Sequence, residues 1–194
     1  MRPLYPLAPA ARLLFNATLI VWLLAEVRQS RRRRHDAVDQ DAGSRNVIRV
    51  TIVTAFFLAG VASGVRWGRI HAPRTELFAV GIVLMWAGIG FRFWAFATLG
   101  RYFTFTVMTS ADQPVVSSGP YRIVRHPSYA GALLALIGIA FVQGSWLSLA
   151  VNIVIPAVGM VNRIRVEESA LVAALGEPYV AYAAGRKRLM PFVW

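Results

Sequence analysis

The sequence has no cysteine among its 194 residues, and this absence removes several kinds of chemistry at once. Disulfide bonds, thiolate nucleophiles and cysteine metal sites are all excluded. Histidine is also scarce, because His35, His71 and His126 are the only three and lie far apart in the chain. A zinc-type site needs closely spaced histidine or cysteine ligands. We therefore expect no bound metal.

Charged residues are few as well, at 15% of the chain, and only nine are acidic. A soluble domain of this length carries about a quarter charged residues. The apolar share of 57% and the mean hydropathy of +0.52 indicate a protein whose solvent is lipid. A disordered chain and a soluble nucleic-acid-binding domain are excluded. The net charge of +12 then fits contact with anionic membrane lipids.

Three apolar runs are long enough to cross a membrane as helices. They are Ala10–Val27, Val47–Val65 and Leu77–Ala97. The first run is not typical of a cleaved signal peptide, because its basic cluster, Arg28 and Arg31–Arg34, follows the run instead of preceding it. We expect it to remain as a membrane anchor.

Two shorter apolar runs, Tyr129–Val142 and Trp146–Val161, are separated by the turn-forming trio Gln143-Gly144-Ser145. This pattern predicts a tight helical hairpin. The fold class is therefore an all-α integral membrane protein with about five transmembrane helices, the last two forming a short C-terminal hairpin.

The third apolar run contains small residues and one charge. Gly81, Gly88 and Gly90 are typical of close helix packing in membranes. Arg92 lies inside the same run, where a charge is costly unless it reaches the surface or faces a cavity. Arg92 either snorkels to the interface or contributes to a site from below.

The basic residues are distributed unequally between the two sides of the predicted membrane. One side receives Arg2, Arg12, Arg66, Arg69 and Arg74, and the other receives Arg28, Arg31, Arg32, Arg33, Arg34, Arg45, Arg49, Arg101, Arg122, Arg125, Arg163, Arg165, Arg186, Lys187 and Arg188. The richer side is expected to be cytoplasmic, which places the N-terminus outside. Arginine far outnumbers lysine and alanine is abundant, which suggests a GC-rich bacterial genome and the bacterial inner membrane.

The unusual polar residues gather on this cytoplasmic side. The connection Thr98–Pro127 is much longer than the usual two to eight residues between neighbouring helices, and long loops are commonly functional. It ends in Arg125-His126-Pro127-Ser128-Tyr129, where the proline holds His126 extended at a helix start. The alternative is a loop that only caps a helix. We divide the chain into an N-terminal three-helix membrane region, 1–97, and a catalytic region, 98–194.

The fifth run continues into charged sequence without a proline or glycine until Gly176. On a continuous helix, Arg163 and Glu167 are four residues apart and share a face. They could form a simple surface ion pair, worth a few tenths of a kcal/mol. Because they sit where the helix leaves the membrane, they are also candidates for a functional site.

An ordered set of motifs resembles the isoprenylcysteine carboxyl methyltransferase family over roughly residues 99–192. The set comprises Ser118-Gly119-Pro120-Tyr121, Arg125-His126-Pro127-Ser128-Tyr129, Glu167-Glu168-Ser169-Ala170-Leu171, Gly176-Glu177-Pro178-Tyr179, Tyr182, Arg188 and Pro191. Membrane phospholipid methyltransferases and sterol-reductase-like enzymes resemble the chain at Arg-His-Pro-x-Tyr alone.

The resemblance implies an enzyme that uses S-adenosyl-L-methionine to methylate the carboxylate of a lipidated cysteine. By matching position, the residues implied to bind the cofactor are Gln113, Pro114, Val115, Val116, Tyr121, His126, Pro127, Ser128, Tyr129 and Glu167. Arg163 is implied to contact the substrate, and Arg163 with Glu167 forms the implied catalytic pair. A carboxylate is ionised at neutral pH, so its methylation needs no general base.

Two other functions remain open. One is an NADPH-dependent membrane lipid or sterol-type reductase, and the other is a non-catalytic membrane scaffold that binds lipid. For the methyltransferase, the acceptor could be an isoprenylcysteine, another amphipathic acid, a prenyl-chain compound or a phospholipid amine. We expect a lipophilic acceptor to enter sideways from the bilayer and the soluble cofactor to enter from the cytoplasm, with the two paths meeting near His126 and Arg163.

Overall fold

The computed structural model describes residues 8–30, 38–39, 43–102, 108–109, 114–190 and 194. Its helices are α1 (Pro9–Ser30), α2 (Ser44–Ala62), α3 (Arg74–Leu99), α4 (Pro127–Gln143), α5 (Trp146–Leu175) and the short α6 (Glu177–Ala184). Three turns of 3₁₀ helix are η1 (Arg66–Gly68), η2 (Gly100–Tyr102) and η3 (Gly119–Arg122). The two-residue strands β1 (Val38–Asp39) and β2 (Met108–Thr109) pair antiparallel, which hydropathy patterns did not predict.

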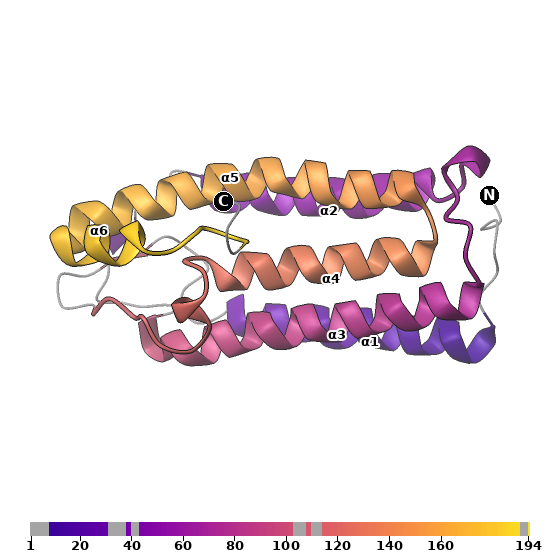
Figure 1. Cartoon of the computed structure of the whole chain (residues 1–194), viewed down its shortest axis with the longest axis horizontal. Coiled ribbons are helices and arrows are strands. Elements are labelled where there is room, and N and C mark those ends of the chain that lie inside the picture. The colour runs from indigo at the N-terminus through magenta and orange to yellow at the C-terminus, as the bar shows by residue number, and fades with distance from the viewer. Residues whose placement is uncertain (1–7, 31–37, 40–42, 103–107, 110–113, 191–193) are drawn as a thin grey trace.

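The five long helices run up and down beside one another (Figure 1). α2 and α5 form one layer, α1 and α3 form the other, and α4 lies between the layers. The α2–α3 and α4–α5 connections lie at one end of the bundle. The α3–α4 connection and α6 lie at the opposite end. The two regions expected to share a face of the membrane are therefore at the same end of the molecule.

The surface of this bundle is that of a membrane protein. α1, α2, α3 and α5 are each long and apolar enough to span a bilayer. Large apolar side chains such as Leu13, Val53, Phe57 and Val83 are more than half exposed. On helices of spanning length, an exposed apolar surface of this extent is typical of contact with a membrane. Most of these helices extend beyond the predicted apolar runs, because polar residues such as those at Ser44–Asn46 continue the helical turns.

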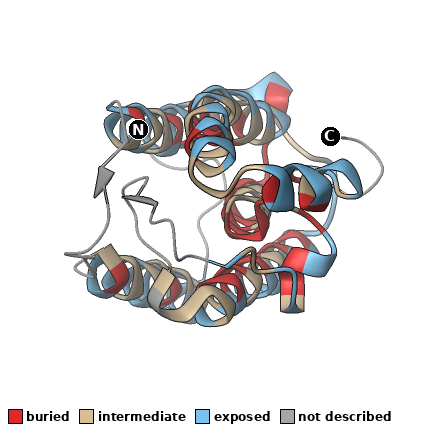
Figure 2. Ribbon diagram, turned by 90° about the vertical axis from the view of Figure 1, so that its left-hand side faces the viewer, coloured by how far each residue is buried: buried red, intermediate tan, exposed pale blue. Residues whose placement is uncertain are grey.

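α4 is shorter, at 17 residues, and it is apolar on all sides. A helix of this kind is buried, and α4 packs against both α3 and α5. Viewed from the end in Figure 2, buried residues concentrate along the middle of the bundle and exposed ones along its outside. The neighbouring helices thus shield much of α4 from lipid.

The predicted hairpin between α4 and α5 is confirmed. α4 ends at Gln143, and the next residue, Gly144, has a φ of +67°, which residues other than glycine adopt only with strain. Ser145 then caps α5, since its hydroxyl accepts a hydrogen bond from the Ser148 N–H at 3.2 Å. α5 continues without interruption to Leu175, as predicted, and Gly176 ends it.

α3 and α4 touch through their backbones at two pairs of glycines. A Cβ atom on Gly88 would lie 2.5 Å from the Gly131 carbonyl oxygen, and one on Gly138 would lie 2.6 Å from the Gly81 carbonyl oxygen. The packing predicted for Gly81 and Gly88 is therefore confirmed. For Gly90 it is wrong, because no atom of the described residues lies within 4 Å of a Cβ at that position.

α2 lies antiparallel along α5 with a defined register. Near one end, the Ser148 hydroxyl donates a hydrogen bond to the Ala59 carbonyl at 2.8 Å. Near the other end, Arg163 Nη1 donates to the Ser44 hydroxyl at 2.7 Å. Gly159 lies between them and approaches Ile48 closely, because a Cβ there would be 3.0 Å from the Ile48 Cα. This register places the first residue of α2 against Arg163.

The glycine contact predicts different responses at two positions of α3. Gly88→Ala should destabilise the protein by about 1–3 kcal/mol, because the new methyl group would overlap backbone atoms of α4. The matched control Gly90→Ala should be neutral or stabilising, since alanine favours helix by about 1 kcal/mol over glycine. Thermal unfolding of both detergent-purified variants measures the difference. Equal melting temperatures for the two variants would contradict the backbone contact.

Candidate active site

A cavity of about 400 Å³ lies between the two helical layers, towards the end that carries the α3–α4 connection. Its polar lining residues are at that end and include Arg45, Arg49, Arg92, Tyr102, Tyr121, Arg125, His126, Ser128, Tyr129, Arg163 and Glu167. Farther along the same helices, the lining is apolar and comprises Trp22, Leu23, Ile52, Val53, Ala132 and Leu136. The cavity is thus polar at one end and apolar at the other.

The structure brings most of the predicted site residues together around this cavity. Lining it are Pro114, Val115, Val116, Tyr121, His126, Ser128, Tyr129, Arg163 and Glu167. Pro127 is buried as the first residue of α4 and is not among the lining residues. Gln113 lies outside the described residues. Arg92, which sequence left undecided, also lines the cavity.

The local sequence explains how the segment before α4 reaches the cavity. Gly119 has a φ of +55° and packs closely on α3, where a Cβ would lie 2.8 Å from Thr98 Oγ1. Pro120 is the second residue of η3, in which Tyr121 is buried. His126 precedes the N1 proline of α4 and is only 4% exposed. A glycine and two prolines therefore set the path of the segment.

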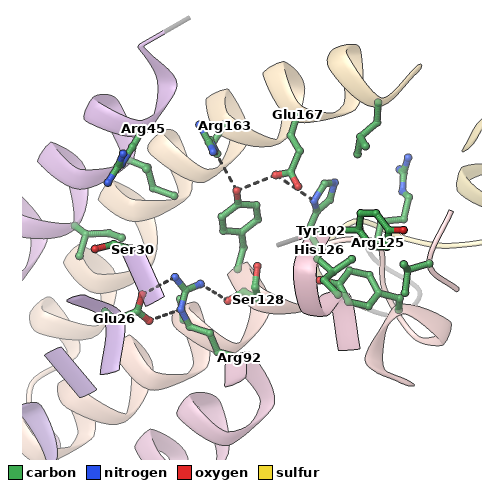
Figure 3. A pocket seen from close by; sticks show the side chains of 18 of the residues that line it. Glu26, Ser30, Arg45, Arg92, Tyr102, Arg125, His126, Ser128, Arg163 and Glu167 are labelled. Atoms are coloured by element: carbon green, nitrogen blue, oxygen red, sulfur yellow. Dashed lines mark hydrogen bonds and ion pairs between the residues drawn. The ribbon is translucent and has the colours of Figure 1, made fainter. Parts of the chain in front are cut away.

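The Tyr129 hydroxyl connects the two predicted catalytic residues of α5. It donates a hydrogen bond to Glu167 Oε2 at 2.8 Å and accepts one from Arg163 Nε at 3.2 Å. Figure 3 draws both contacts as dashed lines that start at the labelled Arg163 and Glu167. Arg163 is 3% exposed, and its Nη1 is held by Ser44. The shared face expected from helical spacing is thus present, with a tyrosine from α4 bridging its two charges.

Arg92 and Glu26 form a charged pair on the side of the cavity opposite Arg163 and Glu167. Arg92 of α3 forms a two-pronged contact with the Glu26 carboxylate of α1, through Nε to Oε1 and through Nη2 to Oε2. Arg92 Nη1 also donates to the Ser128 carbonyl oxygen at 2.8 Å. The Trp22 indole donates to Glu26 at 3.0 Å. Sequence reasoning missed Glu26, although it is the only acidic residue in the first apolar run.

Three tyrosines form an aromatic wall at the polar end. Tyr121, Tyr179 and Tyr182 pack in one buried cluster. The Tyr182 hydroxyl donates to the Tyr121 carbonyl oxygen at 2.9 Å. Burial raises the pKa of Tyr182 to about 12. Burial, followed by the nearby Glu167 carboxylate, also raises the pKa of Tyr121 above its usual range. All three rings, Tyr179 included, are therefore neutral at physiological pH.

Part of the chain that contains this site is similar to a known family. Residues 80–173 match the isoprenylcysteine carboxyl methyltransferase family. The match includes Arg92, His126, Tyr129, Arg163 and Glu167, and it excludes α1 and α2.

Individual relatives extend the comparison over different parts of the chain. An uncharacterized protein of Bacillus subtilis, YpbQ, is 26% identical over 162 residues, covering 81% of this chain and 95% of the relative. Protein-S-isoprenylcysteine O-methyltransferase B of Arabidopsis thaliana is 31% identical over 115 residues. That alignment covers 58% of each of the two proteins, so the chain spans little more than half of the plant enzyme.

A solved structure shares the fold. It is that of the eukaryotic intramembrane Ras methyltransferase ICMT, with a TM-score of 0.59 and 20% sequence identity. The similarity covers 96% of this chain and 69% of the eukaryotic one. All the helices described above thus fall within a known membrane architecture.

Proposed function

The chain belongs to the isoprenylcysteine carboxyl methyltransferase family and is a methyltransferase, and we propose that it methylates a lipophilic acid with S-adenosyl-L-methionine. The proposed acceptor is the carboxylate of an isoprenylcysteine-like compound. In this proposal, residues 98–194 supply most of the polar site, and residues 1–97 supply much of its membrane wall.

The observation that carries the proposal is the two-ended character of the cavity. At its polar end, the Glu167 carboxylate and the buried Arg163 guanidinium are joined through the Tyr129 hydroxyl. Its other end is lined by apolar side chains of α1, α2 and α4. A molecule with an acidic head and an apolar chain matches both ends. A small soluble substrate would leave the apolar end in contact with water, which is unfavourable.

The residues at the polar end fit the proposed cofactor. S-adenosyl-L-methionine supplies an electrophilic methyl group on a sulfonium cation when it is bound. The Glu167 carboxylate and the neutral tyrosine rings would stabilise such a cation. Val115, Val116 and Leu171 offer an apolar surface for an adenine ring. The donors and acceptors needed for the amino acid and ribose parts are present at His126 and Ser128.

Arg163 is suited to orient the acceptor. A guanidinium binds a carboxylate through two parallel hydrogen bonds, which fixes the direction of the carboxylate oxygens. Ser44 and Tyr129 restrain Arg163 from two sides, so little reorganisation accompanies binding. The acceptor oxygen is already anionic at neutral pH, so no side chain needs to remove a proton. The contribution of the protein is orientation and exclusion of water.

We further propose two routes into the cavity. The lipophilic acceptor enters from the bilayer between α1 and α2, whose apolar side chains line the far end of the cavity. The cofactor enters from the water at the end that carries η3 and α6. In this arrangement α4 crosses the membrane as a fifth span, and the site faces the cytoplasm of a bacterial inner membrane.

The proposed orientation predicts the labelling of single cysteines in this cysteine-free chain. Ser117→Cys and Ala184→Cys lie at the site end, Ala72→Cys lies at the other end, and all three residues are exposed. An impermeant maleimide should label only Ala72→Cys in cells with a permeabilised outer membrane. It should label the other two in inverted inner-membrane vesicles. Labelling of Ser117→Cys and Ala184→Cys from opposite sides would overturn the shared cytoplasmic face.

Cofactor binding tests the function directly. Detergent-purified protein should bind S-adenosyl-L-methionine and not NADPH in calorimetric titrations. Glu167→Gln should weaken this affinity by about 1–3 kcal/mol, because a charged partner of the sulfonium is lost. The matched control Glu177→Gln changes an exposed carboxylate of α6 and should bind normally. Binding of NADPH alone would support a reductase, and binding of neither would support a scaffold.

Arg163 should matter for methyl transfer more than for cofactor affinity. Arg163→Ala should lower kcat at saturating cofactor by about 100-fold, and Arg163→Lys should recover little, because an ammonium lacks the planar fork. Arg165→Ala is the matched control, since Arg165 is exposed two residues further along α5. Transfer of labelled methyl to a farnesylated cysteine reports turnover. Near-normal turnover in Arg163→Ala would remove Arg163 from the acceptor site.

A further inference from the structure

Glu168 follows Glu167 directly but has a different environment. Glu167 lines the cavity, and Glu168 is not among the lining residues. The Glu168 side chain is 12% exposed. Its Oε1 lies 3.1 Å from His126 Nε2 and 2.9 Å from Arg125 Nη1. Its Oε2 accepts from Arg188 Nε at 2.9 Å and Nη2 at 2.8 Å. One carboxylate thus joins the segment before α4 to the segment after α6.

These two segments are also held together by their backbones. Arg125 N–H donates to the Lys187 carbonyl at 2.8 Å, and His126 N–H donates to the Arg188 carbonyl at 2.9 Å. The position of His126 is therefore fixed at its backbone by the C-terminal segment. The hydrogen bond to Glu168 then fixes the remaining freedom, which is the rotation of the imidazole ring.

The contact with Glu168 has a consequence for the protons of His126. Three cationic or N–H donors surround the carboxylate, which keeps it ionised, and an ionised carboxylate only accepts hydrogen bonds. The hydrogen of the 3.1 Å contact must therefore be on Nε2 of His126. The other ring nitrogen, Nδ1, is 3.8 Å from Glu167 Oε2, which is too long for a hydrogen bond.

We propose that Glu168 is a positioning residue that holds His126 as the neutral Nε2–H tautomer. In this tautomer Nδ1 is a hydrogen-bond acceptor, and it is presented to the cavity beside Glu167. The ligand it would accept from is an amine or hydroxyl group of the bound cofactor. The identity of this ligand rests on the proposed function, but the tautomer does not. Glu167 and Glu168 thus have separate tasks, one facing the ligand and the other orienting a neighbour.

Other charged groups near His126 agree with this assignment. Arg125 and Arg188 contact Glu168 and place positive charge near the ring. The two carboxylates that face the ring, Glu167 and Glu168, are offset by these two arginines, so the group has no net charge when the imidazole is neutral. Tyr129 of α4 stacks beside the ring with centroids 5.8 Å apart and donates its hydroxyl hydrogen to Glu167. Glu167 Oε2, the carboxylate oxygen 3.8 Å from His126 Nδ1, therefore already accepts a hydrogen bond from Tyr129.

The test measures the ring nitrogens of His126 by long-range ¹H–¹⁵N NMR in detergent at pH 8. Replacing His35 and His71, the other two histidines, by glutamine leaves one imidazole to observe. The proposal expects a protonated Nε2 and an unprotonated Nδ1 without any cofactor. A proton on Nδ1, on both nitrogens, or exchanging between them would overturn it.

Two variants separate positioning from a general structural role. Glu168→Gln should mix the two tautomers and raise the KM for S-adenosyl-L-methionine about tenfold, the effect of one impaired hydrogen bond, with kcat changed by about twofold or less. Arg188→Ala removes the C-terminal partner of Glu168 and should leave the tautomer fixed. Equal mixing in both variants would mean that the whole cluster acts only as a structural clamp, and it would overturn the proposal.

These experiments distinguish a failure of the positioning role of Glu168 from a failure of the proposed function. If wild-type protein neither binds S-adenosyl-L-methionine nor transfers methyl groups, the proposed function fails, and the NMR measurement still decides the tautomer. If wild-type protein is active but Glu168→Gln leaves both the tautomer and the KM unchanged, the positioning role fails alone. Should Glu168→Gln not fold, the wild-type spectrum still supports or overturns the assignment.

Discussion

Charged side chains that enter the apolar layer must find partners inside the protein, because hydrocarbon offers no hydrogen bonds. This constraint organises the bundle around its cavity. Arg92 on α3 is paired with Glu26 on α1 and with a carbonyl at the start of α4, so one guanidinium joins three helices. Arg163 on α5 likewise contacts Ser44 of α2 and Tyr129 of α4. The polar site is therefore also what positions the helices.

The attachment of α1 illustrates this dependence. Only 6% of its apolar span is buried, whereas a third or more of the spans of α3 and α5 is buried. Phe15, Leu19 and Trp22 pack against the core, but most of the apolar surface of α1 faces outward. The contact between Glu26 and Arg92 is directional and requires one position of α1 along α3. By contrast, α3 and α4 are held along most of their length by backbone contact at their glycines, in addition to the bond from Arg92 to Ser128.

Much of the fold could be predicted from the sequence because run length and turn residues are local signals. The hairpin at Gly144 and the continuation of α5 to Gly176 both follow from such signals. The face shared by Arg163 and Glu167 follows from the helical period alone. Contacts between helices depend on the rotation of each helix, which hydropathy does not determine. Glu26 and Ser44 were missed for this reason. Gly90 was misjudged for the same reason, since it faces away from the surface that Gly81 and Gly88 share.

The family match covers most of the polar end of the cavity but little of its apolar end. The family match begins at residue 80 and includes the side chains that surround Glu167 and Arg163. The apolar end is lined largely by α1 and α2, which lie before that match. In the proposed function, methyl transfer depends on geometry at the polar end, whereas the fit of an acyl or prenyl chain depends on the volume and shape of the apolar end. On this proposal, a change of acceptor follows from substitutions at apolar positions such as Leu23, Ile52 or Val53, and these leave Arg163 and Glu167 in place.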